Sequence, residues 1–281
     1  VSCTAELEEA LMDADIAVLA LPSQTTRENS SKISRYFKPE GTVVCCSKGI
    51  EEETGLLLSE VIRQEMPRNE IVILSGPSHA EEIARDIPTT VVAASEKREA
   101  AEYIQDIFMT PTFRVYTNPD VTGVELGGAL KNVIALCAGI SDGLGYGDNT
   151  KAALMTRGIA EISRLGAAMG AHPQTFSGLA GIGDLIVTCT SMHSRNRRAG
   201  ILIGRGRSLQ QALDEVKMVV EGVSTVRPAY RLAKQHDVVM PIIFQAHKVL
   251  FNGKNPRQAV AELMTRERKH EMEEVADVGE W

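Results

Sequence analysis

One lysine and one asparagine, Lys131 and Asn132, stand side by side in a segment whose other residues are small or apolar. If this segment is a helix, Lys131 shares its face with the residues three and four positions away, and none of these carries a charge. An ammonium group that is desolvated in this way loses affinity for its proton and becomes a general acid or base near neutral pH. The alternative is a lysine whose apolar stem is covered while its head group reaches solvent.

A single carboxylate, Asp184, interrupts an apolar run further along the chain. An unpaired charge in such a run is costly, so Asp184 is a candidate partner for Lys131. Ten residues later, Ser194 is placed to cap a helix that has Arg195 in its first turn. A capped helix start with an arginine suits a phosphate group, whereas a basic run alone is usually a solvated face.

The elements that position these residues follow from the hydrophobic pattern. Over residues 1–117, short β-branched runs alternate with amphipathic helical stretches, which is typical of βα units around a parallel sheet. The expected strands are 15–21, 42–46, 71–74, 90–94 and 113–116, and the expected helices are 6–12, 24–37, 55–65, 79–86 and 97–108. After Asn118-Pro119 the chain consists of helical segments broken by glycines. We therefore predict an α/β parallel-sheet domain over 1–117 and an all-α domain over 118–281.

In a doubly wound sheet, ligands bind at the carboxyl ends of the strands, so the segments that follow the strands are candidate sites. Lys48 directly follows the second expected strand, where its ammonium group would face an anionic ligand. The segment Ser75–Ala80 follows the third strand and can open a helix whose free N–H groups face an anion. The segment Leu21–Gln24 follows the first strand, and we interpret it as a turn.

Composition excludes several classes of protein. The net charge of −7 and the isoelectric point near 5.5 argue against general nucleic-acid binding. The five cysteines form no C-x-x-C pair and predict buried thiols in a reducing compartment, and the six histidines lack metal-ligand spacing. We find no apolar stretch that approaches the roughly 20 residues of a membrane span. A cytoplasmic protein without a metal is expected, with a solvated tail at its charged end around Trp281.

Six short motifs follow one another along the chain: Lys48-Gly49, Ser75–Ala80, Leu126–Asn132, Gly183–Leu185, Ser194–Arg198 and Val219–Gly222. In order and approximate spacing they resemble bacterial NAD(P)-dependent glycerol-3-phosphate dehydrogenases, over about residues 15 to 265. The resemblance implies a Rossmann-type domain followed by an all-helical domain. It also implies reversible reduction of dihydroxyacetone phosphate to sn-glycerol 3-phosphate for phospholipid synthesis, with NAD or NADP as cofactor, and a homodimer.

The resemblance further implies a role for each residue that matches a motif. Lys131 would be the catalytic acid/base that exchanges a proton with the substrate oxygen, and Asp184 would orient it. The substrate would contact Lys48, Gly76, Ser78, Asn132, Thr188, Ser194, Arg195 and Asn196. The dinucleotide would contact Lys48, Ala80, Arg195, Val219 and Glu221.

The chain departs from the family's pattern at its start. The family opens with a strand and a G-x-G-x-x-G turn that holds the pyrophosphate, whereas this sequence begins at Val1, past the matching position. Gly143–Gly147 has the wrong spacing for that turn, and we interpret it as a helix-ending loop. The preference between NAD and NADP is therefore not predicted. Two other functions stay open: a truncated, non-catalytic protein that binds a phosphate ligand, and a related hydroxyacid dehydrogenase with another substrate.

Overall fold

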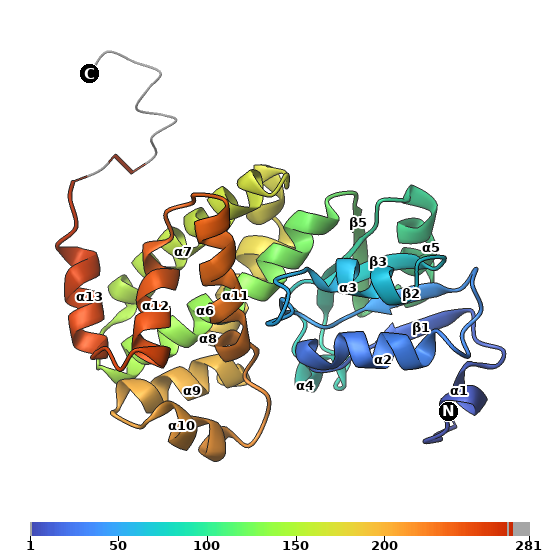
Figure 1. Cartoon of the computed structure of the whole chain (residues 1–281), viewed down its shortest axis with the longest axis horizontal. Coiled ribbons are helices and arrows are strands. Elements are labelled where there is room, and N and C mark those ends of the chain that lie inside the picture. Colours follow the sequence, from blue (N-terminus) through green and yellow to red (C-terminus); the bar gives the residue numbers. More distant parts are fainter. Residues whose placement is uncertain (1, 269, 272–281) are drawn as a thin grey trace, which may run out of the picture.

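The computed structural model describes residues 2–268, 270 and 271. In this part of the chain a sheet domain and a helical domain lie side by side (Figure 1). The long helix α6 (Val121–Gly143) begins at the sheet domain and forms the centre of the helical one. The predicted tail at Trp281 lies outside the described residues.

The sheet domain contains all five predicted strands. They are β1 (Ile16–Leu19), β2 (Thr42–Cys45), β3 (Glu70–Ser75), β4 (Thr89–Ala94) and β5 (Phe113–Asn118), paired in that order. Helix α1 (Leu7–Leu11) precedes β1, and the helices between the strands are α2 (Thr26–Ile33), α3 (Leu58–Glu65), α4 (Ala80–Ile83) and α5 (Arg98–Phe108), with a 3₁₀ turn η1 (Ser23–Thr25) before α2. The predicted helices are thus confirmed in place, although α2 and α4 are much shorter than expected.

The predicted α/β sheet is confirmed as mostly parallel, and the direction of one strand corrects the prediction. Strands β1, β2 and β3 are parallel, β4 is antiparallel to β3, and β5 is parallel to β4. Two neighbouring parallel strands need a crossover connection, usually a helix long enough to carry the chain back along the length of the strands. Helix α4 has four residues, which gives it a length of about 6 Å, so the chain returns in the opposite direction. The carboxyl ends of β1, β2 and β3 therefore share one edge.

The helical domain follows β5, and no further strand occurs in the part of the chain that the structure describes. Besides α6 it contains α7 (Asp148–Ala168), η2 (Pro173–Ser177), the π-helical turn η3 (Leu179–Gly183), α8 (Asp184–Thr190), α9 (Arg195–Gly204), α10 (Leu209–Val216), α11 (Glu221–Gln235), α12 (Pro241–Phe251) and α13 (Pro256–Met264). The predicted loop is confirmed, because Gly145 between α6 and α7 has a φ of +85°. The boundary between residues 117 and 118 stays a prediction.

Helix α6 corrects a second prediction. By length and composition it could cross a membrane, although we expected no apolar stretch of that length. In the structure, however, 94% of its apolar window is buried by the rest of the chain. Helix α6 is therefore the core helix around which the other helices pack, and its apolar character reflects that burial.

Helices α6 and α9 approach each other backbone to backbone. A Cβ atom on Gly139 of α6 would lie 2.1 Å from the carbonyl oxygen of Arg197, and one on Gly200 of α9 would lie 2.1 Å from that of Leu136. Glycine is therefore required on both helices at this crossing. The close approach brings the first turn of α9 up to the middle of α6, where Lys131 and Asn132 are located.

Candidate active site

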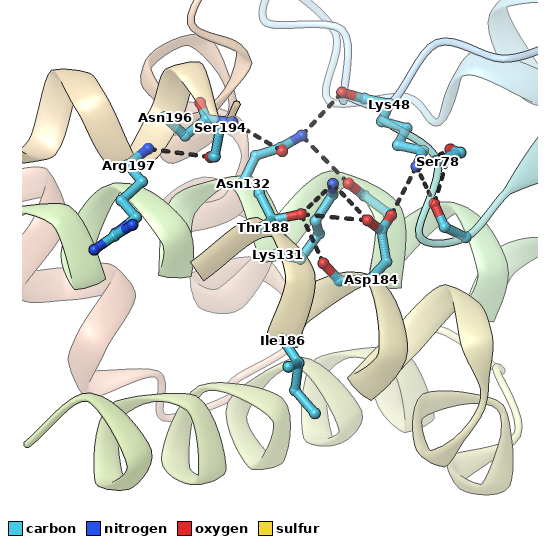
Figure 2. Close-up of polar contacts among 12 residues, drawn as sticks. Lys48, Ser78, Lys131, Asn132, Asp184, Ile186, Thr188, Ser194, Asn196 and Arg197 are labelled. Carbon is cyan, nitrogen blue, oxygen red and sulfur yellow. Dashed lines mark hydrogen bonds and ion pairs between the residues drawn. The ribbon is translucent and has the colours of Figure 1, made fainter. Parts of the chain in front are cut away.

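Lys131 is buried inside the protein and has a carboxylate partner from another helix. Its residue is 6% exposed, and Asp184, the first residue of α8, is 1% exposed. Lys131 Nζ donates to Asp184 Oδ1 and to Thr188 Oγ1, both at 2.8 Å, and Figure 2 shows the three side chains converging. The structure thus brings together the pair proposed from the sequence. A lysine head group that reaches solvent is excluded.

The surroundings of this pair set its ionisation. Burial lowers the pKa of Lys131 to about 8, the nearby Lys48 charge acts in the same direction, and Asp184 opposes both. Burial by itself would raise the pKa of Asp184, but the ammonium groups of Lys131 and Lys48 together lower it. Asp184 therefore stays ionised, while Lys131 can lose or gain a proton near neutral pH.

Lys48 reaches the same carboxylate from the sheet domain. It follows β2, and its Nζ donates to Asp184 Oδ2 at 2.7 Å, to the Gly76 carbonyl at 2.6 Å and to Ser78 Oγ at 3.3 Å (Figure 2). Gly76 has a φ of +136°, and a Cβ there would lie 3.1 Å from Val91 Cα, so glycine is needed after β3. Two ammonium groups around one carboxylate leave a positive site, which suits an anionic substrate.

Asn132 and Asn196 form a chain of hydrogen bonds beside this cluster. Asn132 Nδ2 donates to the Lys48 carbonyl at 3.3 Å, Asn196 Nδ2 donates to Asn132 Oδ1 at 2.9 Å, and the Gly222 N–H donates to Asn196 Oδ1 at 2.8 Å. These hydrogen bonds connect four parts of the chain: the loop that follows β2, and the helices α6, α9 and α11. Both amides are predicted substrate contacts, and each already has protein partners in this structure.

The predicted phosphate-binding helix start is present at α9. Ser194 is its N-cap, and the Ser194 hydroxyl oxygen accepts a hydrogen bond from the Arg197 N–H at 3.2 Å. Arg195 is exposed, and its Nη1 donates to the Val219 carbonyl at 3.4 Å. The structure therefore does not bring the Arg195 guanidinium into the Lys131 cluster. Ala80, at the start of α4, is also exposed.

One contact of the site was missed in the sequence. Segment Leu21–Gln24 was interpreted as a turn, but the Ser23 N–H donates to Glu221 Oε1 at 2.9 Å and the Ser23 hydroxyl donates to Glu221 Oε2. A Cβ on Gly49 would lie 2.5 Å from Ser23 Oγ, which explains the glycine after Lys48. A serine in a turn and a glutamate at a helix start each have an ordinary local interpretation, so the sequence carries little signal for this pair.

Comparison with known proteins gives the family. The model of the NAD-dependent glycerol-3-phosphate dehydrogenase N-terminus matches residues 1–101, and the model of the C-terminus matches residues 120–261. The chain belongs to this dehydrogenase family. A relative from Desulfitobacterium hafniense, named glycerol-3-phosphate dehydrogenase (NAD(P)+), is 62% identical over 266 residues, which cover 95% of this chain and 76% of the relative. A relative from Bacillus subtilis with the same name is 54% identical over 280 residues, which cover 99% of this chain and 81% of the relative.

Solved structures agree with this assignment. The glycerol-3-phosphate dehydrogenase of Coxiella burnetii superimposes with a TM-score of 0.90 at 36% identity, over 94% of this chain and 81% of that one. A ketopantoate reductase from Ralstonia eutropha, at 14% identity and a TM-score of 0.55, shares the fold alone. The chain is therefore an oxidoreductase that uses NAD or NADP, with a Rossmann-type domain before a helical one. The comparisons do not support the two alternative functions.

The edge formed by β1, β2 and β3 fits part of a dinucleotide. Ser75 Oγ, at the end of β3, and His79 Nε2, in the segment that follows β3, are buried atoms with no hydrogen-bond partner among the described residues. Buried polar atoms of this kind are usually satisfied by a ligand or a water. Of the predicted cofactor contacts, Lys48 and Ala80 lie in the segments after β2 and β3, and Glu221 is bonded to Ser23 after β1. Arg195 and Val219 lie at the start of α9 and just before α11, where they contact each other.

Proposed function

We propose that the protein reversibly reduces dihydroxyacetone phosphate to sn-glycerol 3-phosphate with NADH or NADPH, and so supplies the backbone of phospholipids. The observation that carries this proposal is the buried Lys131, held between Asp184 and Thr188 where the two domains meet. A ketone and an alcohol interconvert by transfer of one hydride and one proton. Lys131 has the burial and the pKa that the proton transfer requires.

Residues of this chain can supply the proton that the substrate oxygen takes up and can stabilise the negative charge that develops on that oxygen. Two of the three N–H groups of Lys131 have acceptors among the described residues, which leaves the third for the carbonyl oxygen of the substrate. The bound nicotinamide supplies the hydride. As that oxygen becomes negative, Lys131 donates a proton to it, and the positive charge of Lys48 stabilises it. In the opposite direction, neutral Lys131 accepts the proton of the alcohol.

The remaining contacts belong to the proposal as well. We assign the substrate phosphate to the start of α9, where Ser194, Arg195 and Asn196 are located, because a capped helix start with an arginine favours a phosphate. Gly76, Ser78, Asn132 and Thr188 would complete the substrate site. A cytoplasmic location, a homodimer and the domain boundary at residues 117/118 remain predictions.

Turnover by the wild type and by Lys131→Met tests this function. We expect the wild type to oxidise NADH or NADPH with dihydroxyacetone phosphate, and the variant to lose at least about 10²-fold in kcat because no side chain can transfer the proton. Methionine is unbranched like lysine, one heavy atom shorter and without a titratable group, and the circular dichroism spectrum checks the fold. A folded but inactive wild type would contradict the reaction. Activity retained by the variant would contradict the role of Lys131.

A further inference from the structure

A buried carboxylate joins the two domains six residues before Lys131 on the same helix. Glu125, in the second turn of α6, is 7% exposed. Its Oε1 accepts from the Ser59 N–H at 2.9 Å and its Oε2 accepts from the Ser59 hydroxyl. Ser59 is the second residue of α3, so its N–H is one of the groups at a helix start that lack a partner within the helix. Glu125 therefore binds the N-terminus of a helix that belongs to the other domain.

Two more residues of α6 contact the sheet domain along the same face. Gly128 packs against the ends of β2 and β3, because a Cβ on it would be 2.8 Å from Ser75 Oγ and 3.6 Å from Lys48 Cγ. Asn132 Nδ2 donates to the Lys48 carbonyl. Residues 125, 128 and 132 are three and four positions apart, which places them on one side of a helix. Helix α6 therefore contacts the sheet domain at three positions along this face, and Lys131 is next to Asn132, the last of them.

We propose that Glu125 is a positioning residue for the proton transfer: by binding the start of α3 it sets where α6, and therefore Lys131, lies relative to the sheet domain. The inference rests on the proposed function. Lys131, Asp184 and Thr188 belong to the helical domain, whereas the predicted dinucleotide edge belongs to the sheet domain. A shift of α6 therefore changes the distance between the two reacting partners, and an error of about 1 Å can reduce a rate about 10²-fold.

The helical domain provides a matched control. Glu161 of α7 is 3% exposed, and its carboxylate accepts from the Ile242 N–H at 2.8 Å and from the Ile243 N–H at 3.3 Å, at the start of α12. Like Glu125, Glu161 is a buried glutamate that binds a helix N-terminus. Both of its partners are in the helical domain, so its loss weakens the fold without moving one domain against the other.

Kinetics of three variants test the inference. For Glu125→Ala we expect kcat with dihydroxyacetone phosphate to fall by about 10- to 100-fold, the KM to change by less than about threefold, and the isotope effect with 4-deuterated NADH to increase. Glu125→Gln keeps an acceptor for the Ser59 N–H, so it should retain most of kcat. Glu161→Ala should lower the thermal midpoint and leave kcat and the isotope effect unchanged below that midpoint.

The outcomes separate this inference from the proposed function. A folded wild type without turnover overturns the proposed function and this inference with it. An active wild type whose kcat and isotope effect survive Glu125→Ala, or fall equally in Glu161→Ala, overturns the positioning role alone. If Glu125→Ala does not fold, Glu125→Asp instead shortens the side chain and withdraws the carboxylate from both donors of Ser59, and an unchanged kcat and isotope effect in that variant overturn the inference.

Discussion

At the scale of single residues, the ionisation of Lys131 sets the pH dependence of the reaction. Its pKa is lowered to about 8, mainly by burial. Reduction of the ketone needs the ammonium form, so kcat/KM for dihydroxyacetone phosphate should fall as the pH rises through about 8. Oxidation of the alcohol needs the neutral amine, so kcat/KM for glycerol 3-phosphate should rise through the same value. Initial rates in both directions across the pH range measure this.

The control for this profile is Asp184→Asn. The Asp184 carboxylate raises the pKa of Lys131 against the effects of burial and of Lys48. Its loss should therefore move the midpoint of both profiles to lower pH, by about one unit or more, together with a loss of rate. A midpoint that stays near 8 in the variant would show that another group controls the profile.

At the scale of elements, two helices are capped by a serine in the same way, but only one of them starts at the predicted substrate site. Ser194 caps α9 beside the predicted phosphate contacts, and Ser208 caps α10, where its hydroxyl accepts from the Gln211 N–H at 3.2 Å. Each serine-to-alanine change should lower the free energy of unfolding in urea by about 1 kcal/mol. Only Ser194→Ala should also raise the KM for dihydroxyacetone phosphate. An equal KM in both variants would remove Ser194 from the substrate site.

The elements also show what sequence patterns can and cannot predict. Strand and helix positions follow from local periodicity, and the cap at Ser194 follows from residue type, so both could be predicted. The reversed direction of β4 could not, because it depends on how far the short helix α4 extends in space. The backbone contact between α6 and α9 was missed as well. The glycines at this contact are needed because a Cβ atom would clash with the opposing helix, and the position of that helix is not visible in the sequence.

At the scale of the whole molecule, the site depends on contacts between residues far apart in the chain. Asp184 could be predicted as the partner of Lys131 because each would be costly to bury alone. The contact of Ser23 with Glu221 could not, since each residue is also common in an ordinary turn or helix start. Glu125 was missed for another reason: within α6 it looks like one polar residue in an apolar helix, and its partner belongs to the other domain.

The stability of the whole protein should depend on pH through its buried glutamates. Burial raises the pKa of Glu161 from 4.5 to about 7, and hydrogen bonds from Ile242 and Ile243 oppose that effect. The folded state therefore holds a proton that the unfolded chain releases, so this contribution is complete below the unfolded pKa and is lost as the pH rises through about 7. Between about pH 5.5 and about pH 8.5 it amounts to about 2 kcal/mol.

Glu161→Gln tests this dependence, because glutamine has the same shape and does not titrate. The difference in unfolding free energy between the two pH values, measured in urea, should be smaller in the variant by about 2 kcal/mol. Asp184 acts in the opposite sense, because its lowered pKa stabilises the fold above its unfolded pKa and loses that effect in acid. Since its contribution is nearly constant across this pH window, an unchanged difference in Glu161→Gln would mean that Glu161 is ionised in the folded protein and is held by the start of α12.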